Sequence, residues 1–194
     1  MVERFLEGNR RFIEEDFSKD PEHYAKLATG QSPTSLWIAC SDSRVDPERI
    51  TGARMGDMFI HRNIGNIVPV GDVNLGTVIE YAVNHLKVKD IVVCGHSDCG
   101  AMKALDHESD EEYIPSWLRN AEEVKCQVDK AFGGPGECTD PAARKREIEF
   151  ENIHLQLKNL RTYQAVRAAE EAGSIRLHGI YYDLGTGMLE IVNE

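Results

Sequence analysis

The stretch that most constrains the fold runs from residue 91 to residue 100 and reads IVVCGHSDCG. Its three leading β-branched residues form a short apolar run, which is typical of a strand buried on both faces of a parallel sheet. His96 and Cys99 follow where this strand is expected to end. Imidazole nitrogen and thiolate sulfur are ligands that zinc prefers. The sequence therefore predicts a metal site at the carboxyl end of a buried strand.

A second apolar run, residues 35–40, ends at Cys40 and leads into the polar loop Cys40-Ser-Asp-Ser-Arg44. Ligands of open parallel sheets bind beyond the carboxyl ends of the strands, so this loop is expected beside His96. Cys40 thus becomes a third candidate ligand with His96 and Cys99, and three protein ligands with one open position are typical of catalytic zinc. Asp42 is a candidate fourth ligand or proton acceptor, which Arg44 can hold bidentately off the metal. The alternatives are a buried apolar thiol at Cys40 and a solvated salt pair in the loop.

The other histidines and cysteines lack such a context. They are expected at the surface or in the core, and Cys94 in particular in the core. These residues are His61, His107, His154, Cys94, Cys126 and Cys138.

The remaining patterns alternate between helix and strand, which indicates an α/β fold. We expect a mainly parallel central sheet of four strands plus an antiparallel C-terminal edge strand, flanked by helices. The expected strands are 35–40, 58–63, 91–96, 175–182 and 188–192; the expected helices include 3–17, 21–28, 75–86 with Asn74 as N-cap, 115–132 and two more between 141 and 173.

Composition limits the class of protein. The 194 residues suit a single domain over 1–194, with a helical arm at 1–34 and an α/β core at 35–194. A formal net charge of −11 argues against binding to nucleic acid or anionic lipid. The chain lacks an apolar run of about 18 residues and a signal-peptide pattern, so we expect no membrane span. Five sparsely spaced cysteines suit reduced thiols or metal ligands and hence a cytoplasmic location.

Apolar residues at helical spacing mark the N-terminal arm. Its apolar face can pack on the same chain or on a partner subunit, and the residue pattern leaves both open.

Two motifs together resemble the β-class carbonic anhydrases. These are Cys40-Ser-Asp-Ser-Arg44 and Gly95-His-Ser-Asp-Cys-Gly100, with Arg62-Asn-Ile-Gly-Asn66 and Ile79-Glu-Tyr-Ala82 between them. The order and spacing match over about residues 30–100, a further similar stretch covers 151–179, and residues 106–147 are less distinctive.

The resemblance implies a lyase that reversibly hydrates carbon dioxide to bicarbonate and a proton, by attack of zinc-bound hydroxide. One Zn²⁺ per chain would be held by Cys40, His96 and Cys99, with Asp42 and Arg44 as the catalytic pair. It also implies a homodimer or a dimer of dimers, with the arm wrapped on a partner and the substrate pocket shared across the interface. The positions that resemble the pocket of the plant-type subgroup are Gln31, Phe59, Ile64, Tyr81 and Gly100.

Some bacterial members are shut at low pH or by bicarbonate, with the aspartate bound to zinc and an anion held by a tryptophan, an arginine and a tyrosine. Trp37 and Arg62 match two of these positions, and Tyr182 is a candidate for the third. Ala39, however, stands where that subgroup usually has glycine. We therefore predict an open site, in which the arginine of the loop holds the aspartate.

Two other functions stay open at this point. Relatives with the same metal site attack carbonyl sulfide or carbon disulfide, so the chain is alternatively a hydrolase of those molecules. A non-catalytic, zinc-stabilised binding module is the second alternative.

Overall fold

The computed structural model describes residues 2–192, and the chain divides into two compact units between Ser32 and Pro33. The first unit holds helix α1 (Glu3–Glu15), the single turn η1 (Phe17–Lys19) and helix α2 (Pro21–Thr29). Asp20 caps α2 by accepting the backbone N–H of His23, as its position before a proline suggests. Tyr24 is buried here and stacks on Phe17, with ring centroids 4.4 Å apart. The single-domain organisation over 1–194 stays a prediction.

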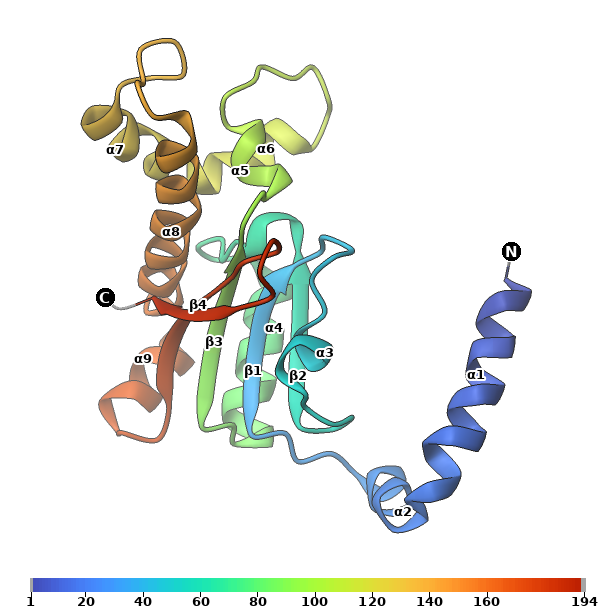
Figure 1. Cartoon of the computed structure of the whole chain (residues 1–194). Helices are drawn as coiled ribbons and strands as arrows, with labels where there is room; N and C mark the ends of the chain where they lie inside the picture. The colour runs from blue at the N-terminus through green and yellow to red at the C-terminus, as the bar shows by residue number, and fades with distance from the viewer. Residues whose placement is uncertain (1, 193–194) are drawn as a thin grey trace. The chain divides into compact units, whose positions relative to one another are not determined.

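The second unit is built on a five-stranded sheet in the order β2-β1-β3-β4-β5. Strands β1 to β4 run parallel, and β5 pairs antiparallel with β4, which confirms the predicted fold class. Because β1 lies between β2 and β3, the strand order reverses at β1, and the carboxyl ends of these strands form one edge (Figure 1). The strands are β1 (Ser35–Cys40), β2 (Met58–Asn63), β3 (Asp90–His96), β4 (Arg176–Tyr182) and β5 (Leu189–Val192).

Helices cover one face of the sheet with a continuous apolar core. Leu36 and Ile91 from the strands pack there with Ile79, Ile153 and other buried residues of the helices. Within residues 2–192, no helix combines the length and the apolarity needed to cross a bilayer. The helices of this unit are α3 (Pro47–Thr51), η2 (Ile64–Asn66), α4 (Val73–Glu80), η3 (Tyr81–Leu86), α5 (Gly100–Ala104), α6 (Ile114–Leu118), η4 (Arg119–Ala121), α7 (Glu122–Phe132), α8 (Pro141–Leu160) and α9 (Gln164–Glu171).

The structure corrects the predicted helix over 75–86 at its start and in the type of its last part, whereas its end at Leu86 is as predicted. Asp72, not Asn74, is the N-cap, because its carboxylate accepts the N–H of Leu75 at 2.7 Å and the helix begins at Val73. The last part, 81–86, is a wider π-helical segment, and Lys87, which follows it, has a left-handed conformation.

The predicted helix over 115–132 is also wrong in its continuity. It is broken into α6, η4 and α7, and the break before α7 lies at Ala121, whose φ of −125° and ψ of 2° are not helical. The indole Nε1 of Trp117 in α6 donates to the carbonyl of Ile64 at 2.8 Å, whereas Val124 and Val128 of α7 are buried in the core near Ile148 of α8.

Candidate metal centre

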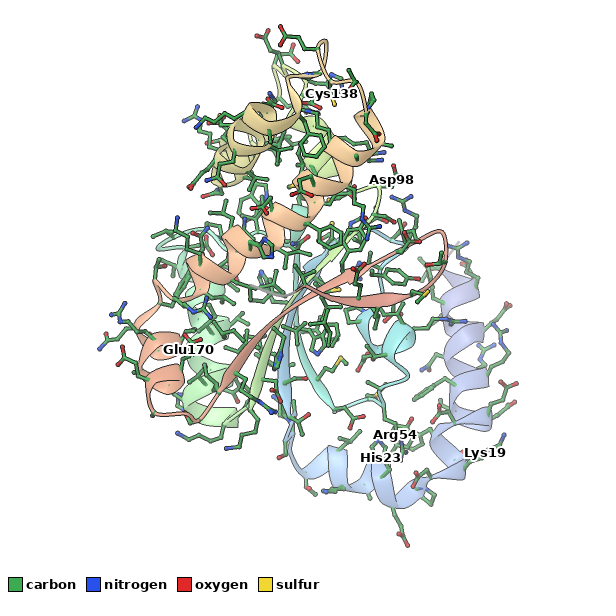
Figure 2. All side chains as sticks on the ribbon, turned by 60° about the vertical axis from the view of Figure 1, so that its left-hand side comes forward. Lys19, His23, Arg54, Asp98, Cys138 and Glu170 are labelled. Atoms are coloured by element: carbon green, nitrogen blue, oxygen red, sulfur yellow. The ribbon has the colours of Figure 1, made fainter. Side chains whose placement is uncertain are left out.

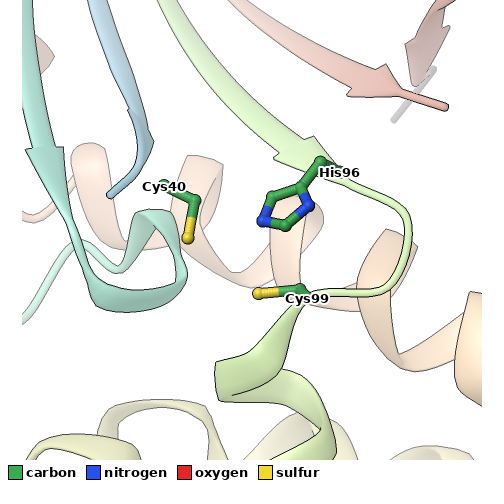
Figure 3. A group of neighbouring side chains, drawn as sticks. All are labelled: Cys40, His96 and Cys99. Carbon is green, nitrogen blue, oxygen red and sulfur yellow. The ribbon is translucent and has the colours of Figure 1, made fainter. Parts of the chain in front are cut away.

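Three predicted ligands meet at the carboxyl edge of the sheet. Cys40 is the last residue of β1, His96 is the last residue of β3, and Cys99 directly precedes α5. All three are buried, and one ligand atom from each lies within 4.8 Å of the others. Figure 3 shows the two sulfur atoms and the imidazole ring turned toward one common point. The structure thus brings together residues that are distant in sequence, as the strand-end argument predicts.

The donor chemistry of this trio fits zinc. The Nδ1 of His96 lies 2.9 Å from the carbonyl of Ser97, which can only accept, so Nδ1 carries the proton and Nε2 keeps its lone pair. Nε2 is buried and has no hydrogen-bond partner among the described residues. Because buried polar atoms are rarely left unpaired, this is what we expect of an atom that binds a metal. Two thiols and one imidazole nitrogen form a ligand set that is typical of zinc with an open fourth position.

Hydrogen bonds favour the thiolate form of Cys40. Its sulfur is close to the Cys99 thiol, and it accepts the backbone N–H groups of Asp42 and Gly65, each at 3.4 Å. The hydrogen bond from Cys99 and these further donors lower the pKa of Cys40 despite its burial. Cys94 is the opposite case, because burial in the core raises its pKa to about 12. The prediction that Cys94 is a core residue is confirmed.

Asp42 and Arg44 form a forked ion pair beside the trio. The guanidinium Nε donates to Oδ1 of Asp42 at 2.9 Å, and Nη2 donates to Oδ2 at 2.7 Å. The backbone N–H of Arg44 also donates to Oδ1, at 2.9 Å. These hydrogen bonds hold the pKa of the Asp42 carboxyl well below its usual range. The predicted pairing is present, and its catalytic role stays a proposal.

A cavity of about 250 Å³ opens beside the ion pair. Two of the predicted pocket residues, Ile64 and Gly100, line it together with Asp42. Ile114 and Leu118 of α6 form a further apolar wall that sequence reasoning missed. These two residues carry no local motif, so only their place on a helical segment after α5 could have suggested them.

The other three predicted pocket residues do not line this cavity. Phe59 pairs with Leu36 at the start of β1, and its ring contacts Tyr81, with centroids 5.8 Å apart. Tyr81 is 44% exposed. Gln31 belongs to the N-terminal unit and is exposed. A role for these residues in a pocket of one chain therefore has no support from this geometry.

Amide side chains of α8 hold the η2 segment that carries Ile64. Asn152 donates to the carbonyl of Gly65 at 3.1 Å, and Gln156 accepts the N–H of Val68 at 2.8 Å. Asn159 donates to the carbonyl of Val68 at 3.1 Å. These three residues, which we call the amide ladder, fix the loop whose Gly65 N–H reaches the Cys40 sulfur.

The three residues that match the bacterial anion pocket have structural contacts. Trp37 lies in a buried cluster against which Tyr182 packs. Arg62 donates from Nε to the carbonyl of Cys40 at 2.8 Å and from Nη2 to the carbonyl of Asp42 at 2.6 Å. Arg62 therefore braces the loop after β1, and a regulatory role of the three residues stays a hypothesis.

Comparison with known proteins shows the family. A family model described as carbonic anhydrase matches residues 35–189. A carbonic anhydrase of Pseudomonas aeruginosa is 40% identical over 194 residues, covering 97% of this chain and 86% of that protein. A carbonic anhydrase of Emericella nidulans is 38% identical over 191 residues, covering 98% of this chain and 83% of that protein.

Solved structures place the chain within one class of this family. The β-carbonic anhydrase CcaA superposes with a TM-score of 0.90 at 37% identity, covering 99% of this chain and 95% of that one. A tetrameric β-carbonic anhydrase of Sordaria macrospora superposes with a TM-score of 0.92 at 34% identity, covering 100% and 97% of the two chains. With the matched fold, the matched family model and the Cys-His-Cys trio, the chain belongs to the β-class carbonic anhydrases, a family of enzymes.

Proposed function

We propose that this chain catalyses the reversible hydration of carbon dioxide to bicarbonate and a proton. One Zn²⁺ per chain would be held by Cys40, His96 and Cys99. The proposal is carried by one observation: the buried trio lies within 4.8 Å beside an ion-paired carboxylate. A bound zinc ion supplies Lewis-acid chemistry, because it lowers the pKa of coordinated water, an effect already established for carbonic anhydrases.

Arg44 holds the Asp42 carboxylate in place as a hydrogen-bond acceptor beside the metal site. The three hydrogen bonds from Arg44 keep the carboxylate ionised, so Asp42 can only accept hydrogen bonds. An ionised carboxylate beside the reacting water can accept a hydrogen bond from that water and so orient it, whereas the lowered pKa of Asp42 makes it a weak proton acceptor. The fork also restrains Asp42 from becoming a fourth metal ligand, which supports the open form of the site.

The apolar cavity suits a small uncharged substrate. Ile64, Ala101, Ile114 and Leu118 present hydrocarbon surface next to Asp42, so carbon dioxide can enter without losing strong hydration. We further propose that Phe59, Tyr81 and Gln31 of a second copy complete the pocket in a homodimer or a dimer of dimers. The exposed ring of Tyr81 supports an interface at this place. A cytoplasmic location is also proposed, because all five cysteines are free.

Stopped-flow hydration assays with measured zinc content test the proposal. Wild type is expected to hold one zinc per chain and to hydrate carbon dioxide. Cys40→Ser should lose both, because two protein ligands hold zinc poorly. Cys126→Ser is the matched control, since Cys126 is exposed and lies in α7. Zinc-loaded wild type without hydration activity would end the proposal.

Two further measurements separate the alternatives. Turnover of carbonyl sulfide or carbon disulfide well above that of carbon dioxide would assign the chain to hydrolases of those molecules. A binding module predicts that Asp42→Ala changes no measured activity, whereas the proposed enzyme loses hydration rate in this variant.

A further inference from the structure

Asp98 lies between two of the candidate ligands, in the turn that leads from β3 to α5. Its backbone is left-handed, with a φ of 61°, a conformation that few residues other than glycine, asparagine and aspartate adopt readily. Figure 2 marks Asp98 at the edge of the sheet where the loops gather. Its side chain is 43% exposed and contributes no ligand atom to the Cys-His-Cys trio.

Asp98 binds the same guanidinium that grips Asp42. Nη1 of Arg44 donates to Oδ2 of Asp98 at 3.2 Å, and Nη2 donates to the Asp98 carbonyl at 3.3 Å. The adjoining edge of the guanidinium, Nε and Nη2, faces Asp42, so Nη2 donates to both residues. Arg44 therefore bridges the loop after β1 and the turn after β3, with one carboxylate on each of two adjoining edges.

Two lysines anchor the other oxygen of Asp98. The Nζ of Lys103, from α5, lies 2.7 Å from Oδ1, and the Nζ of Lys145, from α8, donates to the same atom at 2.5 Å. The Asp98 carboxylate is thus held from two helices on one side and offers Oδ2 to Arg44 on the other. These helices lie outside the loop that contains Asp42 and Arg44.

We propose that Asp98 is a positioning residue: it holds Arg44 in the orientation in which the guanidinium binds Asp42. Lys103 and Lys145 in turn anchor the Asp98 carboxylate. Arg44 is 48% exposed, so solvent screens its pairing with Asp42 and a second partner adds to its restraint. A second carboxylate on the adjoining edge of the guanidinium disfavours the orientations in which Arg44 turns away from Asp42. The consequence for turnover rests on the proposed function; the positioning itself does not.

Two substitutions at Asp98 test this role while sparing the backbone. Asp98→Asn keeps the shape and the tolerance for positive φ but removes the charge. Asp98→Gly also keeps the backbone conformation and removes the whole side chain. Asp90→Asn is the matched control: Asp90 accepts hydrogen bonds from Arg176 and begins β3, whereas the ligand His96 ends that strand. Zinc content and thermal unfolding confirm that each variant is folded and loaded.

The first readout is hydrogen exchange at the Nε–H of Arg44, followed by NMR in the zinc-loaded protein. We expect exchange to be faster by up to about fivefold in both Asp98 variants, the upper end for one half-exposed ion pair, and unchanged in Asp90→Asn. The second readout is kcat/KM for carbon dioxide hydration, which should fall by a similar factor, up to about five.

Unchanged exchange in both Asp98 variants would overturn the proposal. So would a loss of kcat/KM with unchanged exchange, because the effect would then reach the site through Cys99 rather than Arg44. Equally faster exchange at Arg44 in Asp90→Asn would show that the loss of any carboxylate charge has this effect, and it would also overturn the proposal. If wild type fails to hydrate carbon dioxide, the proposed function fails, and the exchange measurement still decides the role of Asp98.

Discussion

Gly95 allows α8 to lie directly against β3, one residue before the ligand His96. A β-carbon at this position would lie 2.7 Å from Cδ1 and 2.8 Å from Cγ1 of Ile153. Ordinary contacts between carbon atoms begin near 3.5 Å, so α8 or the strand must move. Ile153 is fully buried, with 0% exposure, and its Cγ2 also packs against the backbone at Gly179. Gly95→Ala is therefore expected to strain the core next to the metal centre.

The expected loss is about 1–3 kcal/mol of unfolding free energy, the range for one added methyl group in a packed core. For a chain of this length that corresponds to a fall in Tm of about 3–10 °C. Urea titration and thermal unfolding at one fixed protein and zinc concentration measure it. Gly134→Ala is the control, because a β-carbon at Gly134 meets no heavy atom within 4 Å.

A double-mutant cycle locates the strain. Ile153→Ala alone should cost about 2–5 kcal/mol, because it leaves a cavity. In the double variant the added methyl group occupies part of that cavity, so the combined loss should be smaller than the sum by about 1 kcal/mol or more. Simple additivity, or a Gly95→Ala variant with the Tm of wild type, would refute the steric reasoning.

Three further predictions concern the cap, an ion pair and the metal. Asp72→Ala removes the cap of α4 and should lower the unfolding free energy by about 1 kcal/mol in urea titration. Burial raises the pKa of Asp129, but hydrogen bonds from Lys125 and Arg144 outweigh it and lower that pKa overall. The ionised Asp129 carboxylate therefore stabilises the fold fully above its unfolded pKa near 4, and this stabilisation is lost as the pH falls through the lower folded pKa. The difference in unfolding free energy between wild type and Asp129→Asn should accordingly shrink below about pH 4. Removing zinc with a chelator should lower the Tm of wild type but not of Cys99→Ser.

Each of these predictions has a result that contradicts it. Asp72→Asn keeps a capping oxygen, so equal losses in the Asn and Ala variants would argue against capping. A difference between wild type and Asp129→Asn that grows at low pH would reverse the expected sign. A chelator effect in Cys99→Ser as large as in wild type would place the bound metal elsewhere.

The metal centre could be predicted from sequence because its signals are local. Cys40 and His96 each end a short apolar run, and the topology of parallel strands brings such ends to one edge. The same reasoning placed Asp42 and Arg44 on one short loop, where a fork between neighbours is geometrically easy. Periodicity and turn residues also located all five strands.

The parts that could not be predicted depend on contacts between distant segments. Asp98 is part of the motif around the ligands, but its contact with Lys145 could not be predicted. Lys145 comes from α8, and no local sequence pattern specifies where that helix packs. Ile114 and Leu118 became pocket residues only because α6 ends near Ile64. Asn74 was the predicted cap of α4, and only the hydrogen bond from the N–H of Leu75 to the Asp72 carboxylate shows that the helix begins earlier.

The amide ladder of α8 has a mechanical consequence. Its amides match individual backbone groups of Gly65 and Val68. A slide of α8 along its axis by even one turn, about 5.4 Å, would leave those groups buried and unpaired. The three amides therefore fix the axial position of α8 against the loop that carries Gly65 and Val68.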